Sequence, residues 1–264
     1  MLGAILGDII GSSYEFSNTK VLDFDLFPKT AFFTDDTLLT VATAYSLLNS
    51  VSFEKSYTMF TNQYPDLDYG ASFYKWILSD IKKPYNSYGN GSAMRVSPVV
   101  GFYNTQNDIL NWSEKTAVVT HNHPEGIKGA QATSLAAFLL KIKKSKSEVK
   151  STIENKFQYN LDNHISEHTR LAFDESCQGT VPYAIQCVLS SDNFENAVRK
   201  AILLGGDSDT MACIAGSIAE YAFGIPEHFA MKIYEYLPSN FIEIIERFYK
   251  VTNQKTYDVL VSSK

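Results

Sequence analysis

Three glycines recur at intervals of four residues near the start of the chain, at positions 3, 7 and 11. In a helix over residues 2–10 this spacing places them on one face, because residues four apart lie one above the other. Each interior glycine costs a helix about 1 kcal/mol relative to alanine, so such a helix is stable only with close neighbours. The pattern therefore predicts a helix buried deep inside a helical protein.

Helical periodicity also dominates the remaining sequence, and no segment shows sustained alternation of apolar and polar residues. Proline is scarce, with 8 residues in 264, which favours helices over a turn-rich β protein. The fold class predicted is a compact all-α domain over residues 1–264, with too many short helices for a four-helix bundle. The clearest further helices are expected over residues 35–48, 135–142, 194–202, 209–223 and 241–248.

Residues with strong preferences for helix ends mark several boundaries. Thr34 is the expected N-cap of the helix that starts at residue 35, and Asp192 is the expected N-cap of the one near residue 194. Gly205 and Gly206 should end that helix, and Pro226 should open a later one.

The charge distribution argues against a nucleic-acid partner. The formal net charge is −6, whereas duplex-binding proteins usually carry a basic patch. We interpret the one basic run, which has no interleaved aromatic residues, as a solvated helix end and linker inside a polar stretch over residues 141–168. This run comprises Lys141, Lys143, Lys144, Lys146 and Lys150.

The cysteines and the chain start bear on location. Three cysteines, at positions 177, 187 and 213, match no zinc spacing, and reduced thiols fit a cytoplasmic protein. The apolar first ten residues lack a basic flank and are broken by Asp8, so we expect neither a signal peptide nor a membrane span. An acidic surface without patches is compatible with a monomer.

Two acidic clusters stand at expected helix starts. The first contains Asp35 and Asp36 after Thr34, and the second contains Asp207 and Asp209 before Thr210. Taken singly, each cluster is explained by helix capping and by the favourable interaction of carboxylates with a helix N-terminus.

Together the clusters indicate a second interpretation. Four carboxylates gathered in a buried site repel one another unless a cation compensates them. Ligation by oxygen alone selects hard ions, so the predicted cofactor is Mg²⁺ or Mn²⁺, as a pair about 3.5–4 Å apart in a two-metal hydrolytic site.

At this point the sequence resembles the ADP-ribosylglycohydrolases, the family of the dinitrogenase reductase-activating glycohydrolase and the eukaryotic ADP-ribosyl hydrolases. The resemblance runs from Gly3 to about Pro226, and five motifs follow in the family's order. They are GDIIGSSYE at 7–15, FTDDT at 33–37, GNGSAMR at 89–95, THNHP at 120–124 and GGDSDT at 205–210.

The resemblance implies a compact all-α fold with a metal pair in a central cleft. It places Glu15 near the metals, as a catalytic base, a ligand or a gate. The inventory of carboxylates adds Asp36 and Asp209 as alternative bases. It assigns the two sides of the metal pair to two sets of residues. These are Thr34, Asp35 and Asp36 on one side, and Asp207, Asp209 and Thr210 on the other.

The glycine-rich segment has two explanations: a turn before residues 96–100, or a nest of backbone N–H groups that binds an anion. The resemblance favours the second, with the diphosphate of ADP-ribose held by Gly89, Asn90, Gly91, Ser92 and Met94. Arg95 either neutralises phosphate or pairs with a core acid.

The histidines and aromatic residues are less specific. His121 is predicted to contact the ribose, whereas His123 is expected to be a hydrogen-bonded residue at the start of a helix after Pro124. Tyr69 and Tyr88 are candidates for stacking on adenine.

The function predicted is hydrolysis of an N- or O-glycosidic bond that joins ADP-ribose to a protein or small molecule. The regions between motifs are short, so the sequence leaves the acceptor open. Two alternatives remain: a non-catalytic ADP-ribose-binding relative, and a metal-dependent nucleotide diphosphate hydrolase.

Overall fold

The computed structural model describes residues 1–19, 21–162 and 169–262. This part of the chain contains sixteen helices and two isolated β-bridges, so the all-α prediction is confirmed. The helices are α1 (Leu2–Gly11), α2 (Asp35–Asn49), α3 (Phe53–Gln63), α4 (Ala71–Leu78), α5 (Gly91–Met94), α6 (Ser97–Phe102), α7 (Gln106–Ala117), α8 (Pro124–Lys141), α9 (Lys146–Phe157), α10 (Cys177–Leu189), α11 (Phe194–Leu203), α12 (Ser208–Phe223), α13 (Glu227–Ala230), α14 (Ile233–Tyr236), α15 (Ser239–Thr252) and α16 (Gln254–Ser262).

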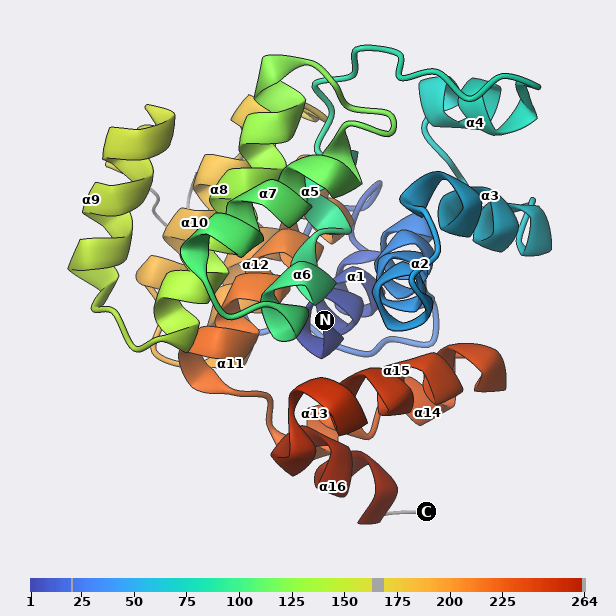
Figure 1. The fold of residues 1–264 in the computed structure, drawn as a ribbon. Coiled ribbons are helices and arrows are strands. Elements are labelled where there is room, and N and C mark those ends of the chain that lie inside the picture. Colours follow the sequence, from blue (N-terminus) through green and yellow to red (C-terminus); the bar gives the residue numbers. More distant parts are fainter. Residues whose placement is uncertain (20, 163–168, 263–264) are drawn as a thin grey trace.

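Helices α1 and α12 form the centre of the molecule (Figure 1), and every residue of α1 is buried. The two helices touch through small residues. A Cβ atom added to Gly7 would lie 2.1 Å from the carbonyl oxygen of Ala212, and one added to Gly3 would lie 2.2 Å from that of Gly216. Only glycine permits this approach, so the expectation from the glycine spacing is confirmed.

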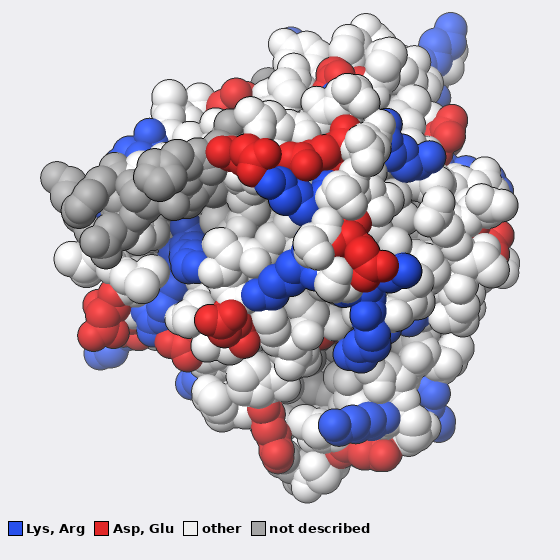
Figure 2. Space-filling view, turned by 90° about the vertical axis from the view of Figure 1, so that its left-hand side faces the viewer, with Lys and Arg blue, Asp and Glu red and all other residues white. Residues whose placement is uncertain are grey.

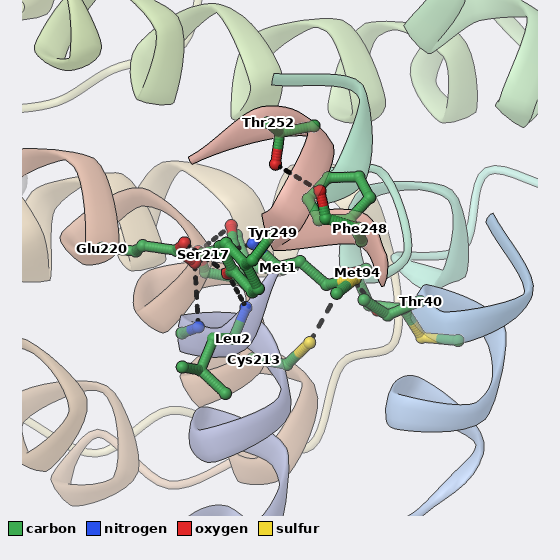
Figure 3. A network of polar contacts seen from close by, with 12 residues as sticks. Met1, Leu2, Thr40, Met94, Cys213, Ser217, Glu220, Phe248, Tyr249 and Thr252 are labelled. Atoms are coloured by element: carbon green, nitrogen blue, oxygen red, sulfur yellow. Dashed lines mark hydrogen bonds and ion pairs between the residues drawn. The ribbon is translucent and has the colours of Figure 1, made fainter. Parts of the chain in front are cut away.

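A polar network ties the start of α1 to α12 and α15 (Figure 3). The α-amino group of Met1 forms a 2.7 Å ion pair with Glu220 on α12. Glu220 also accepts a 2.6 Å hydrogen bond from the hydroxyl of Tyr249 on α15, which in turn accepts one from the backbone N–H of Leu2. These contacts fix the register of α1 against its neighbours.

The two acidic clusters lie at the N-termini of helices that both pack on α1. Thr34 caps α2 and accepts a 3.2 Å hydrogen bond from the N–H of Asp36, as expected. Gly205 and Gly206 both have φ of 73°, which lets the chain turn between α11 and α12. The packing of α2 and α12 against α1 therefore places both clusters on one side of the central helix.

Two predicted helix boundaries are wrong by a short distance. Asn193, not Asp192, caps α11, and its side chain accepts a 2.8 Å hydrogen bond from the N–H of Asn196. Asp192 lies one residue too early for this geometry. Helix α8 ends at Lys141, so Ile142 falls outside it and is half exposed.

The interpretation of the basic run as a solvated helix end and linker is also wrong in part. Residues 146–157 form α9, which starts with a complete capping box at Ser145 and Glu148. The Lys141 ammonium is half-buried and donates to the carbonyl oxygens of Val100 and Tyr103, at 2.6 and 3.2 Å. Residues 163–168 of the same polar stretch lie outside the described part.

The surface on the α9 side mixes the two signs of charge, with Lys and Arg interspersed among Asp and Glu (Figure 2). Cys177, Cys187 and Cys213 are buried and free. Among the described helices, none combines the length and the apolar character needed to cross a membrane.

Candidate active site

A cavity of about 360 Å³ opens where the N-termini of α2, α5 and α12 converge beside the end of α1. Apart from Ser92, the residues predicted as metal ligands, catalytic base and contacts to ribose and diphosphate line its wall. They are Glu15, Thr34, Asp35, Asp36, Gly89, Asn90, Gly91, Met94, His121, Asp207, Asp209 and Thr210.

Direct contacts join the two acidic clusters across this cavity. The hydroxyl of Thr210 donates to Asp36 Oδ1 at 3.3 Å. The side-chain amide of Asn90, at the start of α5, donates to Asp207 Oδ2 at 2.7 Å. The tertiary structure thus brings together segments that lie about 170 residues apart in the chain. The motifs alone did not establish that these segments meet.

The carboxylate of Glu15 joins the second cluster. Glu15 lies in the turn that follows α1, and one carboxylate oxygen from each of Glu15, Asp207 and Asp209 lies within 4.8 Å of the others. Partial burial, followed by the nearby charge of Asp207, raises the pKa of Glu15 to about 7. A carboxyl group with this pKa exchanges protons near neutral pH.

Two buried carboxylate oxygens at the cavity have no hydrogen-bond partner in the described part of the chain, namely Asp36 Oδ2 and Asp209 Oδ1. Burial raises the pKa of both carboxyl groups well above the usual range. The nearby charge of Asp8 raises the pKa of Asp36 further, and the charge of Asp36 does the same for Asp209. Unpaired buried anions of this kind fit a hard divalent cation, which supplies the missing compensation.

Asp8 is a site residue that sequence analysis missed. It lies on α1, is fully buried, and accepts hydrogen bonds from the backbone N–H and the hydroxyl of both Thr34 and Thr37. Burial nevertheless raises its pKa to about 6, and these hydrogen bonds oppose the shift. The available signals were a single carboxylate inside an otherwise apolar helix and its place in the motif at 7–15.

The glycine-rich segment lies beside His121. A Cβ atom added to Gly91 would lie 3.3 Å from His121 Nε2, so the glycine makes room for the ring. His121 is buried, and its Nδ1 lies 2.7 Å from the hydroxyl of Thr120. Burial, with a smaller effect of Arg95, lowers the pKa of His121 well below its usual value, so the ring is neutral.

Arg95 lines the cavity and pairs with no core acid among the described residues, whereas its contact with a phosphate stays a prediction. Its guanidinium donates to the carbonyl oxygen of Thr116 and the hydroxyl of Thr120, at 3.1 and 2.7 Å, and lies 4.6 Å from the ring centre of Tyr57. The buried guanidinium therefore supports the segment that carries His121.

Ser92 does not line the cavity. Its side chain is fully buried on α5, and its hydroxyl donates to the carbonyl oxygen of Gly126 at 2.7 Å. The direction of α5 places this hydroxyl against α8 instead, so a side-chain contact from Ser92 to a ligand in the cavity is not supported.

The two tyrosines proposed for stacking also lie away from the cavity wall. Tyr69 is buried and donates to the carbonyl oxygen of Tyr64, whereas Tyr88 packs against His123 with ring centres 5.4 Å apart. His123 itself caps α8, as expected, and accepts a hydrogen bond from the N–H of Glu125.

Three exposed phenylalanines line the cavity, namely Phe16, Phe32 and Phe173. Nothing in the sequence distinguishes them from the other phenylalanines among the 17 in the chain. Of two further acids at the cavity wall, Glu175 was missed, whereas Asp68 lies in the segment 64–70 that the resemblance places as a pocket-lining loop. None of these residues belongs to a recognisable motif, so, apart from Asp68, only the packing of distant segments identifies them.

The fold is all-helical, and carboxylates from two helix N-termini meet in one cavity. The protein is therefore an all-α protein with an acidic candidate metal site. The family model of ADP-ribosylglycohydrolase matches residues 1–257, and the chain belongs to this family. The family consists of ADP-ribosyl hydrolases, which act on ADP-ribosylated substrates and are typically metal-dependent.

Relatives agree with this assignment over most of the chain. ADP-ribosylhydrolase ARH3 of Homo sapiens is 26% identical, over 86% of this chain and 85% of its own length. A putative ADP-ribosyl glycohydrolase, L543, of Acanthamoeba polyphaga mimivirus is 25% identical, over 97% and 95%. A solved ADP-ribosylglycohydrolase-related protein complex has the same fold, with a TM-score of 0.67 at 19% identity over 98% of this chain and 97% of that one.

Proposed function

We propose that this chain is a metal-dependent hydrolase that cleaves an N- or O-glycosidic bond of an ADP-ribosylated protein or small molecule and releases ADP-ribose. The observation that carries the proposal is that Asp36 and Asp209, which line the cavity together with Glu15, each have a buried carboxylate oxygen without a partner among the described residues. In this proposal residues 1–264 form one domain that acts as a monomer.

The proposed cofactor is a pair of Mg²⁺ or Mn²⁺ ions. Thr34, Asp35 and Asp36 would hold one side of the pair, and Asp207, Asp209 and Thr210 the other. When bound, such ions lower the pKa of water and fix the orientation of hydroxyl groups on a substrate. The donors are all oxygen atoms, which is the set that these hard ions prefer.

The chain's own groups supply the remaining chemistry. Glycosidic cleavage passes through an oxocarbenium-like state at the anomeric carbon, which water then attacks. The acceptor group leaves with the electron pair of the broken bond and takes up a proton, while Glu15, with its raised pKa, accepts the proton that the water loses. Asp36 and Asp209 are the alternative bases, although their proposed role as ligands makes them weaker candidates.

Neighbouring groups would orient the rest of the substrate. Neutral His121 contacts the distal ribose, and the backbone of Gly89, Asn90, Gly91 and Met94 binds the diphosphate. Asn90 is well placed for this because its side chain is fixed between Asp207 and the hydroxyl of Thr180, at 2.7 and 3.1 Å. The diphosphate therefore meets a loop with little freedom to move.

The experiment is product analysis by mass spectrometry. The protein is incubated with ADP-ribosylated arginine, ADP-ribosylated serine and O-acetyl-ADP-ribose, with Mg²⁺ or Mn²⁺ and with EDTA. Release of ADP-ribose that EDTA abolishes supports the proposal and identifies the acceptor. Formation of AMP and ribose phosphate would instead indicate a diphosphate hydrolase. Binding of the substrates without release of ADP-ribose would indicate a non-catalytic ADP-ribose-binding protein.

The Glu15→Gln variant tests the proposed base. Its turnover should fall by about 10²- to 10⁴-fold, the range for loss of a general base. Glu54→Gln, which changes an exposed glutamate on α3, is the matched control and should keep full turnover. Full turnover of a folded Glu15→Gln variant would remove Glu15 from the mechanism.

A further inference from the structure

Two exposed aromatic rings meet at the mouth of the cavity. The rings of Phe16 and Phe173 are stacked, with centres 6.5 Å apart and an interplanar angle of 23°. Their side chains are 79% and 51% exposed, so neither ring is part of the core. Phe16 directly follows Glu15, whereas Phe173 belongs to the segment that precedes α10.

We propose that Phe16 and Phe173 form an aromatic clasp that positions the Glu15 carboxylate over Asp207 and Asp209. The clasp is a positioning device for the hydrolase activity and rests on that proposed function. It adds two residues that neither the motifs nor the acidic clusters point to.

The Phe173 side of the clasp is firmly anchored. The backbone N–H of Leu171 donates to the carbonyl oxygen of Leu204 at 2.7 Å, and the carbonyl oxygen of Glu175 accepts from the N–H of Asn90 at 2.7 Å. These bonds flank Phe173 on both sides and fix it to α11 and α5. Phe173 therefore offers a fixed surface for a ring on the opposite wall.

On the Phe16 side, the hydroxyl of Tyr14 donates to the carbonyl oxygen of Asp25 at 2.5 Å, and the side chain of Asn18 lies against Gly205. Among the described residues, none donates a hydrogen bond to the Glu15 carboxylate, although Asp207 and Asp209 lie beside it. The position of the carboxylate therefore depends on the position of the turn that carries it. The ring contact made by the next residue joins this turn to the segment that carries Phe173.

The strength of the contact suits this role. Aromatic pairs shift a two-state equilibrium by roughly 2- to 10-fold beyond the effect of buried area. That is enough to favour one position of the turn, yet weak enough to open when a substrate enters. A ring as exposed as Phe16 contributes little to folding, so its loss should leave the fold intact.

A double-mutant cycle tests the clasp. Phe16→Ala and Phe173→Ala should each lower kcat by about 3- to 10-fold with KM within about twofold, and the double variant should fall no further than either single one. Phe16→Tyr should restore kcat, because it keeps the ring, whereas Phe16→Leu should not. Tyr74→Ala, an exposed aromatic outside the cavity and without a ring partner among the described residues, is the control.

Hydrogen exchange provides a readout that does not need turnover. The backbone amides of residues 12–18 should exchange several-fold faster in Phe173→Ala, although the substitution lies on the opposite wall, and Tyr74→Ala should not change them. The clasp would be overturned by unchanged exchange or by additive losses of kcat in the double variant. A raised KM with unchanged kcat would also overturn it, because that result indicates direct stacking of the rings on the substrate. Absence of turnover in the unmodified protein would refute the hydrolase, while exchange still decides whether the clasp holds the turn.

Discussion

Two buried aspartates on adjacent helices have opposite surroundings. Asp8, in the middle of α1, accepts hydrogen bonds at both carboxylate oxygens, all from Thr34 and Thr37. Asp209, in the first turn of α12, has one buried oxygen without any partner in the described part of the chain. Both carboxyl groups have raised pKa values, so burial by itself does not separate a supporting acid from a candidate ligand.

The difference between them is unmet hydrogen-bonding capacity at the cavity wall. Asp8 accepts hydrogen bonds from residues at the start of α2, and so fixes the turn that carries Asp35 and Asp36. Asp209 keeps its capacity free and lines the cavity, which Asp8 does not. The contrast predicts that Asp8 matters chiefly for stability and Asp209 chiefly for activity.

The largest expected effect is the loss of activity in Asp209→Asn. Turnover should fall by more than about 100-fold, because removal of a direct metal ligand exceeds the 10- to 100-fold loss typical of outer-shell partners. The free energy of unfolding of the metal-free variant should not fall, since burial and the charges of Asp36 and Asp207 disfavour the ionised Asp209. Steady-state kinetics and urea unfolding check both, with exposed Asp23→Asn as the control.

The next effect is the loss of stability in Asp8→Ala. The variant leaves the N–H and hydroxyl groups of half-buried Thr34 and buried Thr37 without their acceptor, which should lower the free energy of unfolding by about 3 kcal/mol. Urea unfolding in EDTA should show a much smaller loss in Asp209→Ala. Equal losses of the free energy of unfolding in the two variants would show that the two aspartates do not differ in their effect on stability.

Metal binding should stabilise the protein to a similar degree. At an Mg²⁺ or Mn²⁺ concentration of about 100 times Kd, a bound ion raises the free energy of unfolding by about 2.7 kcal/mol. EDTA should reverse the rise, and Asp209→Asn should abolish most of it while Asp23→Asn keeps it. Thermal unfolding with and without ions measures this, and a protein that shows no shift would contradict the proposed cofactor.

The smallest effect is a pH dependence of the metal-free protein. Because burial raises the pKa of Asp8 from 3.8 to about 6, the folded state binds the proton more tightly than the unfolded state. Stability from Asp8 is thus present at low pH and is lost as pH rises through the folded pKa. Between about pH 5.5 and pH 7.5 the free energy of unfolding should fall by about 1 kcal/mol.

Substitution separates this contribution from that of the other acids. The raised pKa values of Asp35, Asp36 and Asp209 act in the same direction as that of Asp8. Urea unfolding of Asp8→Asn across the same pH range should show a shallower slope than the unmodified protein. A stability that rises with pH in EDTA would show that these carboxylates are not protonated in the fold.

The sequence by itself determined the features that depend on neighbours within a turn or two of helix. The glycines at 3, 7 and 11 required a helix in close contact with another, and Gly216 and Ala212 provide it. Thr34 before a pair of acids was enough to define the start of α2. Such features are local because caps, helix periodicity and steric room involve residues close together in the chain.

Only the tertiary structure decided which faces of distant helices meet. It joined Thr210 to Asp36, turned the hydroxyl of Ser92 away from the cavity, and brought Phe16 against Phe173. It also converted Asp8 from a polar interruption in an apolar helix into the acceptor that fixes the start of α2. These outcomes depend on the packing of α1, α2, α5 and α12, and burial and partners follow from packing rather than from spacing along the chain.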